Sequence, residues 1–124
     1  MIEKMNLTES DIKENYQEFI TFVSDFFEGE RKTRLLKMYS EDNLGLSLAM
    51  SPAATTEHFH LCHPGGYIQH IMHVVKNSFV QKKAFEMGGG TPNWTDEEMV
   101  FAALHHDLGK LGDPQFGDYY IAQT

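Results

Sequence analysis

The residues best suited to chemistry are the adjacent pair His106 and Asp107, in the segment LHHDLGK (104–110). An imidazole nitrogen and a carboxylate oxygen at the end of one helix can both reach a single cation. On a helix, neighbouring side chains point about 100° apart, so the cation must lie between their two directions. The sequence therefore predicts a cation site at this segment.

A third ligand has to come from another element, and His70 on the preceding predicted helix is the best candidate. The 36 residues from His70 to His106 leave room for one helix, a glycine turn and an antiparallel return. Two imidazoles and one carboxylate suit a divalent transition metal better than Mg²⁺, which prefers oxygen ligands. The identity of the metal stays open among Mn, Fe, Zn, Ni and Co.

The elements expected to position these residues are helical. Thr8 is the predicted N-cap of a first helix, with Asp11 three residues further on. Behind Thr8, apolar residues recur at helical spacing: Ile12, Tyr16, Phe19, Ile20, Val23, Phe26 and Phe27. Gly29 is expected to end or loosen this helix, and shorter helices are predicted over residues 30–39 and 43–50.

A loop with several histidines is expected over residues 52–66, followed by a long helix over 67–87 that ends at a run of three glycines. Thr95 and Glu98 form a capping box at the start of the last predicted helix, which runs up to Gly109. No segment alternates in the manner of a strand. The fold prediction is a single all-α domain, with N-terminal helices in 1–50, a motif-bearing core in 59–110 and an incomplete tail in 111–124.

Two segments carry a resemblance to a known family. They are HDLGK (106–110) and the upstream HPGGYIQH (63–70). Together they resemble the signature of the HD-domain superfamily of metal-dependent phosphohydrolases, and the upstream segment is similar to the His-Pro-Gly-Gly…His stretch of an exoribonuclease-like branch. The resemblance spans residues 59–110, under half of the chain.

The resemblance implies an HD-like helical bundle that holds a metal between helices. It implies His70, His106 and Asp107 as metal ligands, with Asp107 able to bridge two ions. The metal would activate water for attack on a phosphoryl group. Lys110 would steady Asp107 or the substrate phosphate, so Asp107 and Lys110 are the candidate catalytic residues.

The family completes its site with a further aspartate on a later helix. The only carboxylates after Asp107 are Asp113 and Asp118, both in the loop-like tail. We therefore expect either a domain truncated at its C-terminus or a degraded site. On the substrate side we expect His63, His105 and Lys110, although exposure or a second metal is also open for His105.

The amino-acid composition limits the kinds of partner that the protein is expected to bind. The 124 residues carry 10 Lys and Arg against 18 Asp and Glu, a net charge of −8, which argues against bulk binding of nucleic-acid phosphates. A small phosphorylated substrate such as a nucleotide stays compatible, because a bound divalent cation reverses the charge locally. No stretch has the length and apolarity of a membrane span or signal peptide, and Cys62 has no cysteine to pair with. We expect a cytoplasmic protein, without a membrane partner.

Three functions remain in competition. The first is an HD-type phosphohydrolase that acts on a nucleotide or another small phosphate ester. The second is an HD-fold binding or regulatory module that is catalytically incomplete. The third, an HD-fold di-iron oxygenase, is disfavoured because no histidine follows His106. We also expect a homodimer, with the tail residues Tyr119, Tyr120 and Ile121 near its interface.

Overall fold

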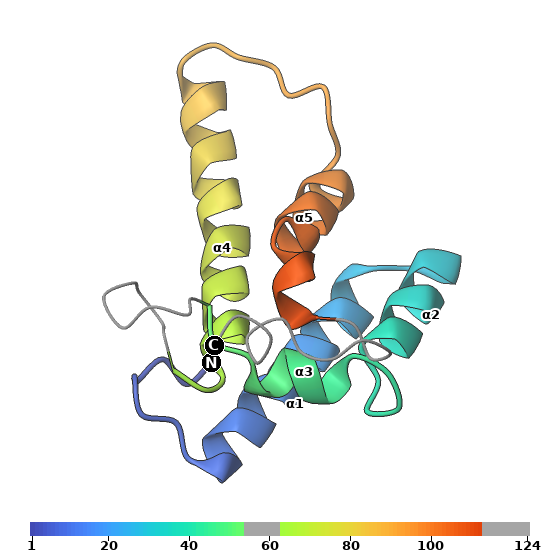
Figure 1. The fold of residues 1–124 in the computed structure, drawn as a ribbon. Coiled ribbons are helices and arrows are strands. Elements are labelled where there is room, and N and C mark those ends of the chain that lie inside the picture. The colour runs from blue at the N-terminus through green and yellow to red at the C-terminus, as the bar shows by residue number, and fades with distance from the viewer. Residues whose placement is uncertain (54–62, 113–124) are drawn as a thin grey trace.

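The computed structural model describes residues 1–53 and 63–112, and over these ranges the chain forms helices and no strand (Figure 1). The predicted all-α fold is confirmed. In chain order the elements are α1 (Glu9–Phe26), α2 (Gly29–Met38), α3 (Gly45–Met50), α4 (Gly66–Met87), α5 (Asp96–His105) and a 3-10 turn, η1 (Leu108–Leu111). The predicted tail interface at residues 119–121 lies outside the described residues.

Helix α1 is the element around which the other N-terminal helices pack. Its capping box forms as the spacing of Thr8 and Asp11 indicates: the Thr8 hydroxyl accepts from the Asp11 N–H, and the Asp11 carboxylate accepts from the Thr8 N–H. Its apolar face lies in the core and contacts α2, α3 and α4. The Tyr16 hydroxyl donates a 2.7 Å hydrogen bond to the Tyr39 carbonyl, which joins α1 to the end of α2.

Helices α4 and α5 form an antiparallel hairpin, joined by the loop at the top of Figure 1. The capping box of Thr95 and Glu98 forms as predicted at the start of α5. An ion pair between Lys82 and Asp96 links the far part of α4 to the first turn of α5. This hairpin sets the ends of α4 and α5 that carry the candidate ligands beside each other.

Two helix boundaries differ from the sequence-based expectation. Gly29, with a φ of 64°, begins α2 instead of ending α1, which stops at Phe26. Helix α5 stops at His105 and does not continue to Gly109, because Asp107 leaves the helical region with φ −115° and ψ 20°. The chain then tightens into η1 and buries the Leu111 side chain, which is 1% exposed. Because of this bend, the Asp107 side chain does not point in the direction that a continuous helix would give it.

The turn before α4 requires glycine. Gly65 has a φ of +85°, in the left-handed region that favours glycine. A Cβ at Gly65 would lie 2.7 Å from the Leu7 side chain and 3.1 Å from that of Ile12. The backbone N–H of Gly65 donates to the Met50 carbonyl at 3.0 Å. The start of α4, and with it His70, is thereby anchored on α1 and α3.

The surface of the hairpin carries apolar side chains that are open to solvent. Four of them lie in the far half of α4: Phe79, Val80, Phe85 and Met87. The Phe85 ring also contacts the Trp94 ring, with 5.8 Å between centroids. Within the described residues, none of the helices combines the length and the apolarity that crossing a bilayer requires.

Candidate metal centre

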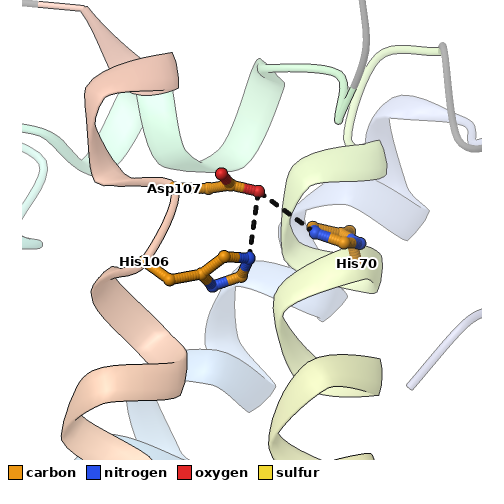
Figure 2. Close-up of side chains that lie close together, drawn as sticks. All are labelled: His70, His106 and Asp107. Carbon is orange, nitrogen blue, oxygen red and sulfur yellow. Dashed lines mark hydrogen bonds and ion pairs between the residues drawn. The ribbon is translucent and has the colours of Figure 1, made fainter.

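Three side chains converge where α4 and the end of α5 lie side by side, and they are those predicted as metal ligands (Figure 2). His70 lies on α4, whereas His106 and Asp107 directly follow α5. Asp107 Oδ2 is 3.2 Å from His70 Nε2 and 3.1 Å from His106 Nε2. The two imidazole centroids are 5.6 Å apart, inside the limit of about 8 Å beyond which one metal could not join both rings.

The cluster is half-covered. The exposed fractions of the side chains are 18% for His70, 23% for Asp107 and 40% for His106. His70 therefore lies toward the protein interior, and solvent reaches the cluster mainly at His106.

A backbone contact fixes the tautomer of His106. His106 Nδ1 is 2.8 Å from the Ala103 carbonyl oxygen, which can only accept, so Nδ1 carries the hydrogen. In the neutral ring Nε2 then presents a lone pair to the Asp107 carboxylate. Two acceptors 3.1 Å apart repel unless a proton or a cation lies at that position. Metal-ligating histidines commonly donate their other ring N–H to a backbone carbonyl in this way.

The spacing and chemistry of the donor atoms fit a divalent transition metal. The three ligand atoms all lie within 4.8 Å of one another. A metal about 2.1 Å from each ligand holds neighbouring ligand atoms about 3.0–3.4 Å apart, which matches both distances from Asp107 Oδ2. It allows at most about 4.2 Å between any two of them, so donor atoms 4.8 Å apart would have to move closer together on binding. Two imidazole nitrogens and one carboxylate oxygen also favour a transition metal over Mg²⁺.

Lys110 lies beside the same carboxylate oxygen. Its Nζ is 3.4 Å from Asp107 Oδ2 and donates a 3.0 Å hydrogen bond to the Ala53 carbonyl. The side chain remains 34% exposed. The ammonium group is therefore held next to Asp107 and can also be reached by a solute.

His63 has a protein partner in the structure. Its Nε2 is 2.6 Å from Gln69 Oε1. Gln69 Nε2 donates to the carbonyls of Ile2 and Lys4 at 3.0 Å each, so Oε1 is the accepting end and His63 Nε2 must donate. His63 Nδ1 is buried and has no hydrogen-bond partner among the described residues. The hydrogen bond to Gln69 fixes the orientation of the His63 ring. The substrate contact suggested for His63 stays a prediction.

His105 lies away from the three converging donor atoms. Its Nδ1 donates to the Phe101 carbonyl at 2.6 Å, and its ring packs between those of Phe101 and Tyr39. Burial lowers the pKa of His105, against the smaller opposing effect of the bond to Phe101. Its suggested roles in substrate or second-metal binding remain predictions.

Sequence reasoning missed the groups that hold His106, Lys110 and His63 in place. The Ala103 carbonyl could have been found, because the last carbonyls of a helix lack partners within it. The Ala53 carbonyl and the Gln69 amide could not, since Ala53 is 57 residues from Lys110 and Gln69 bonds to backbone more than 60 residues away. The sequence offers no local signal for such distant contacts.

Comparisons of this chain with family models, curated proteins and solved structures found no match.

Proposed function

We propose that this protein is a metal-dependent phosphohydrolase of the HD type that acts on a nucleotide or another small phosphate ester. The observation that carries the proposal is the convergence of His70 Nε2, His106 Nε2 and Asp107 Oδ2 within 4.8 Å. The resemblance of segments 63–70 and 106–110 to the HD signature supports the same assignment. All three donor residues and both motif segments lie within the described ranges.

In this proposal His70, His106 and Asp107 hold a divalent transition metal. A metal in such a site lowers the pKa of bound water and offsets the negative charge of a phosphoryl group. The Ala103 carbonyl keeps the hydrogen of His106 on Nδ1, so Nε2 remains the coordinating atom. The His106 ring cannot change tautomer without losing this hydrogen bond. The bond therefore keeps Nε2 available to a metal.

In this proposal the Lys110 ammonium group binds the phosphate group of the substrate. It is held by the Ala53 carbonyl next to Asp107, and its partial exposure lets it meet a phosphate oxygen that enters from solvent. Because the chain carries a net charge of −8, an anionic substrate is attracted only by such local positive charge. This favours a small ester over a polyanion that would extend across the acidic surface.

The proposal is tested by hydrolysis assays on the metal-loaded chain. The assay supplies Mn²⁺, Co²⁺, Ni²⁺, Zn²⁺ or Fe²⁺ with bis(4-nitrophenyl) phosphate and a panel of nucleoside monophosphates and cyclic nucleotides. We expect turnover that EDTA abolishes and that Asp107→Ala eliminates without loss of helical circular dichroism. Asp25→Ala removes an exposed carboxylate from α1 and should retain wild-type turnover.

The outcomes distinguish the competing functions. Turnover in Asp107→Ala at the wild-type rate would overturn the assignment of the site. Mn²⁺ binding that depends on Asp107, without hydrolysis of any ester in the panel, would contradict the enzymatic proposal and favour an HD-fold binding module. Oxygen consumption by the iron-loaded chain without phosphate release would favour the oxygenase.

A further inference from the structure

A pocket lies between α2 and α5. It has a volume of about 590 Å³, within the usual range of small-molecule sites. Leu35, Met38 and Leu108 supply aliphatic lining, and the rings of Phe101 and His105 form an aromatic wall. The candidate metal centre lies between α4 and α5, so the two sites use different sides of α5.

The rings of the aromatic wall contact each other and the core. The rings of Phe101 and His105 lie 4.4 Å apart between centroids, and His105 stacks on the buried ring of Tyr39 at 5.9 Å with 15° between planes. The hydrogen bond from His105 Nδ1 to the Phe101 carbonyl fixes the imidazole. The Phe101 and His105 rings are inclined to each other by 49°. A planar aromatic group can therefore pack against the Phe101 ring and meet His105 at its edge, with few flexible side chains to order first.

Two arginines from α2 stand at the rim of the pocket. The Arg31 guanidinium lies 4.8 Å from the centroid of the Phe101 ring, and the side chain is 45% exposed. Arg34 also lines the pocket and is 77% exposed. Guanidinium groups bind carboxylate and phosphate through paired N–H groups. An anionic group above the aromatic wall would therefore meet positive charge.

Both arginines pair with glutamates, and one of these, Glu30, also lines the pocket. Arg31 pairs with Glu97 at 3.3 Å, and Arg34 pairs with Glu30 at 2.6 Å. All four side chains are at least 42% exposed, and ion pairs open to solvent contribute little to stability. A ligand anion that also buries an aromatic body can displace the glutamates from the guanidinium groups.

We propose that this pocket binds a small amphipathic anion, with a planar aromatic body against Phe101 and His105 and one carboxylate or phosphate group on Arg31 and Arg34. Both a nucleoside monophosphate and an aromatic carboxylate have this chemistry. The aliphatic lining formed by Leu35, Met38 and Leu108 covers the remaining faces of the ring system. None of the pocket's lining residues belongs to the three metal donors, so binding here can be tested without metal, although His105 is also one of the residues expected on the substrate side.

The probes separate the contribution of charge from that of the rings. Backbone amide shifts of the ¹⁵N-labelled chain are followed by NMR in EDTA, with 2-naphthoate, its neutral carboxamide, acetate and AMP as ligands. We expect 2-naphthoate to saturate with a dissociation constant of about 1 mM or tighter. The carboxamide should bind about tenfold more weakly, and acetate should not saturate. Shifts should concentrate on α2 and the last turn of α5, and displacement of 2-naphthoate by AMP would identify a nucleotide site.

Matched variants locate the binding. Arg31→Met keeps an aliphatic stem over Phe101 and should weaken 2-naphthoate about fivefold or more while leaving the carboxamide unchanged. Lys37→Met removes the same charge from an exposed position of α2 that does not line the pocket, and should change neither ligand. Equal binding of acid and amide, equal effects of the two variants, shifts centred on α4, or no saturation would each overturn the proposal.

Discussion

At the scale of single residues, Asp107 Oδ2 is the atom on which the candidate metal centre depends. Two imidazole nitrogens and the Lys110 ammonium lie between 3.1 and 3.4 Å from this one oxygen. In the metal-free chain the lysine offsets the charge of the carboxylate. A metal cation at the same place would have to bind beside that lysine, so the two positive charges oppose each other.

Replacing Lys110 by methionine should therefore tighten metal binding. Removal of one positive charge about 5 Å from a dication is worth about 1–2 kcal/mol in a water-like dielectric, or about five- to thirtyfold in affinity. Mn²⁺ titration followed by electron paramagnetic resonance measures the change. Lys37→Met, which has the same effect on net charge, should leave the affinity unchanged. Weaker Mn²⁺ binding by Lys110→Met would instead show that the lysine holds Asp107 in position.

At the scale of elements, the start of α4 depends on the turn at Gly65. Alanine there would have to adopt a φ of +85° and would place its Cβ 2.7 Å from Leu7. We expect Gly65→Ala to lower the free energy of unfolding by about 2–4 kcal/mol, from backbone strain and overpacking together.

The control for this turn is Gly29→Ala at the start of α2. Gly29 also has a positive φ, of 64°, but a Cβ there would have nothing within 4 Å. Only the backbone strain remains, so the loss of stability should be about 1 kcal/mol. Urea unfolding measures both variants. Equal losses would mean that the contact of Gly65 with α1 does not fix the start of α4.

The capping box of α5 should make part of its stability depend on pH. The Thr95 N–H donates to the Glu98 carboxylate and holds the pKa of Glu98 below its ordinary value of 4.5. Since the folded pKa is depressed, the stabilisation is present above pH 4.5 and disappears as the pH falls through the folded pKa. Glu98→Gln should thus be less stable than the wild type at pH 7 but equally stable at low pH.

Urea unfolding at pH 7 and pH 3 measures this dependence. Glu14→Gln, which neutralises an exposed carboxylate of α1 outside any capping box, should show no comparable change in its difference from the wild type. A pH-independent difference for Glu98→Gln would assign the effect to side-chain size and not to the ionised cap.

At the scale of the whole molecule, the far half of α4 offers apolar side chains to a second copy. Val80 is 61% exposed and Met87 is 80% exposed, and Phe85 and Trp94 pack against each other nearby. Exposed apolar groups concentrated on one element are typical of interfaces, and the commonest symmetric solution is a two-fold dimer.

We expect the chain to form a homodimer through this part of α4. Light scattering at micromolar concentration should give twice the 14.2 kDa mass of one chain. Val80→Glu should shift the species to a monomer, whereas Lys76→Glu, at an exposed position one turn earlier, should leave it a dimer. A single 14.2 kDa species for the wild type would contradict the expectation.

The sequence by itself determined the helices and where most of them begin. Both capping boxes formed at the predicted threonines, because a cap depends on residues three positions apart. The apolar face of α1 was readable for the same reason, since helical spacing places its residues on one side. The choice of His70, His106 and Asp107 also came from sequence, through short motifs whose residues are adjacent or one helix hairpin apart.

The tertiary structure decided how those residues are held. Helix α5 ends at His105 because the following turn buries Leu111 in a core that other helices build. His63 bonds to Gln69, whose amide is fixed by the carbonyls of Ile2 and Lys4 near the N-terminus. The pocket between α2 and α5 likewise joins residues about 70 positions apart. Such contacts follow from packing between distant segments, which no local pattern of residues encodes.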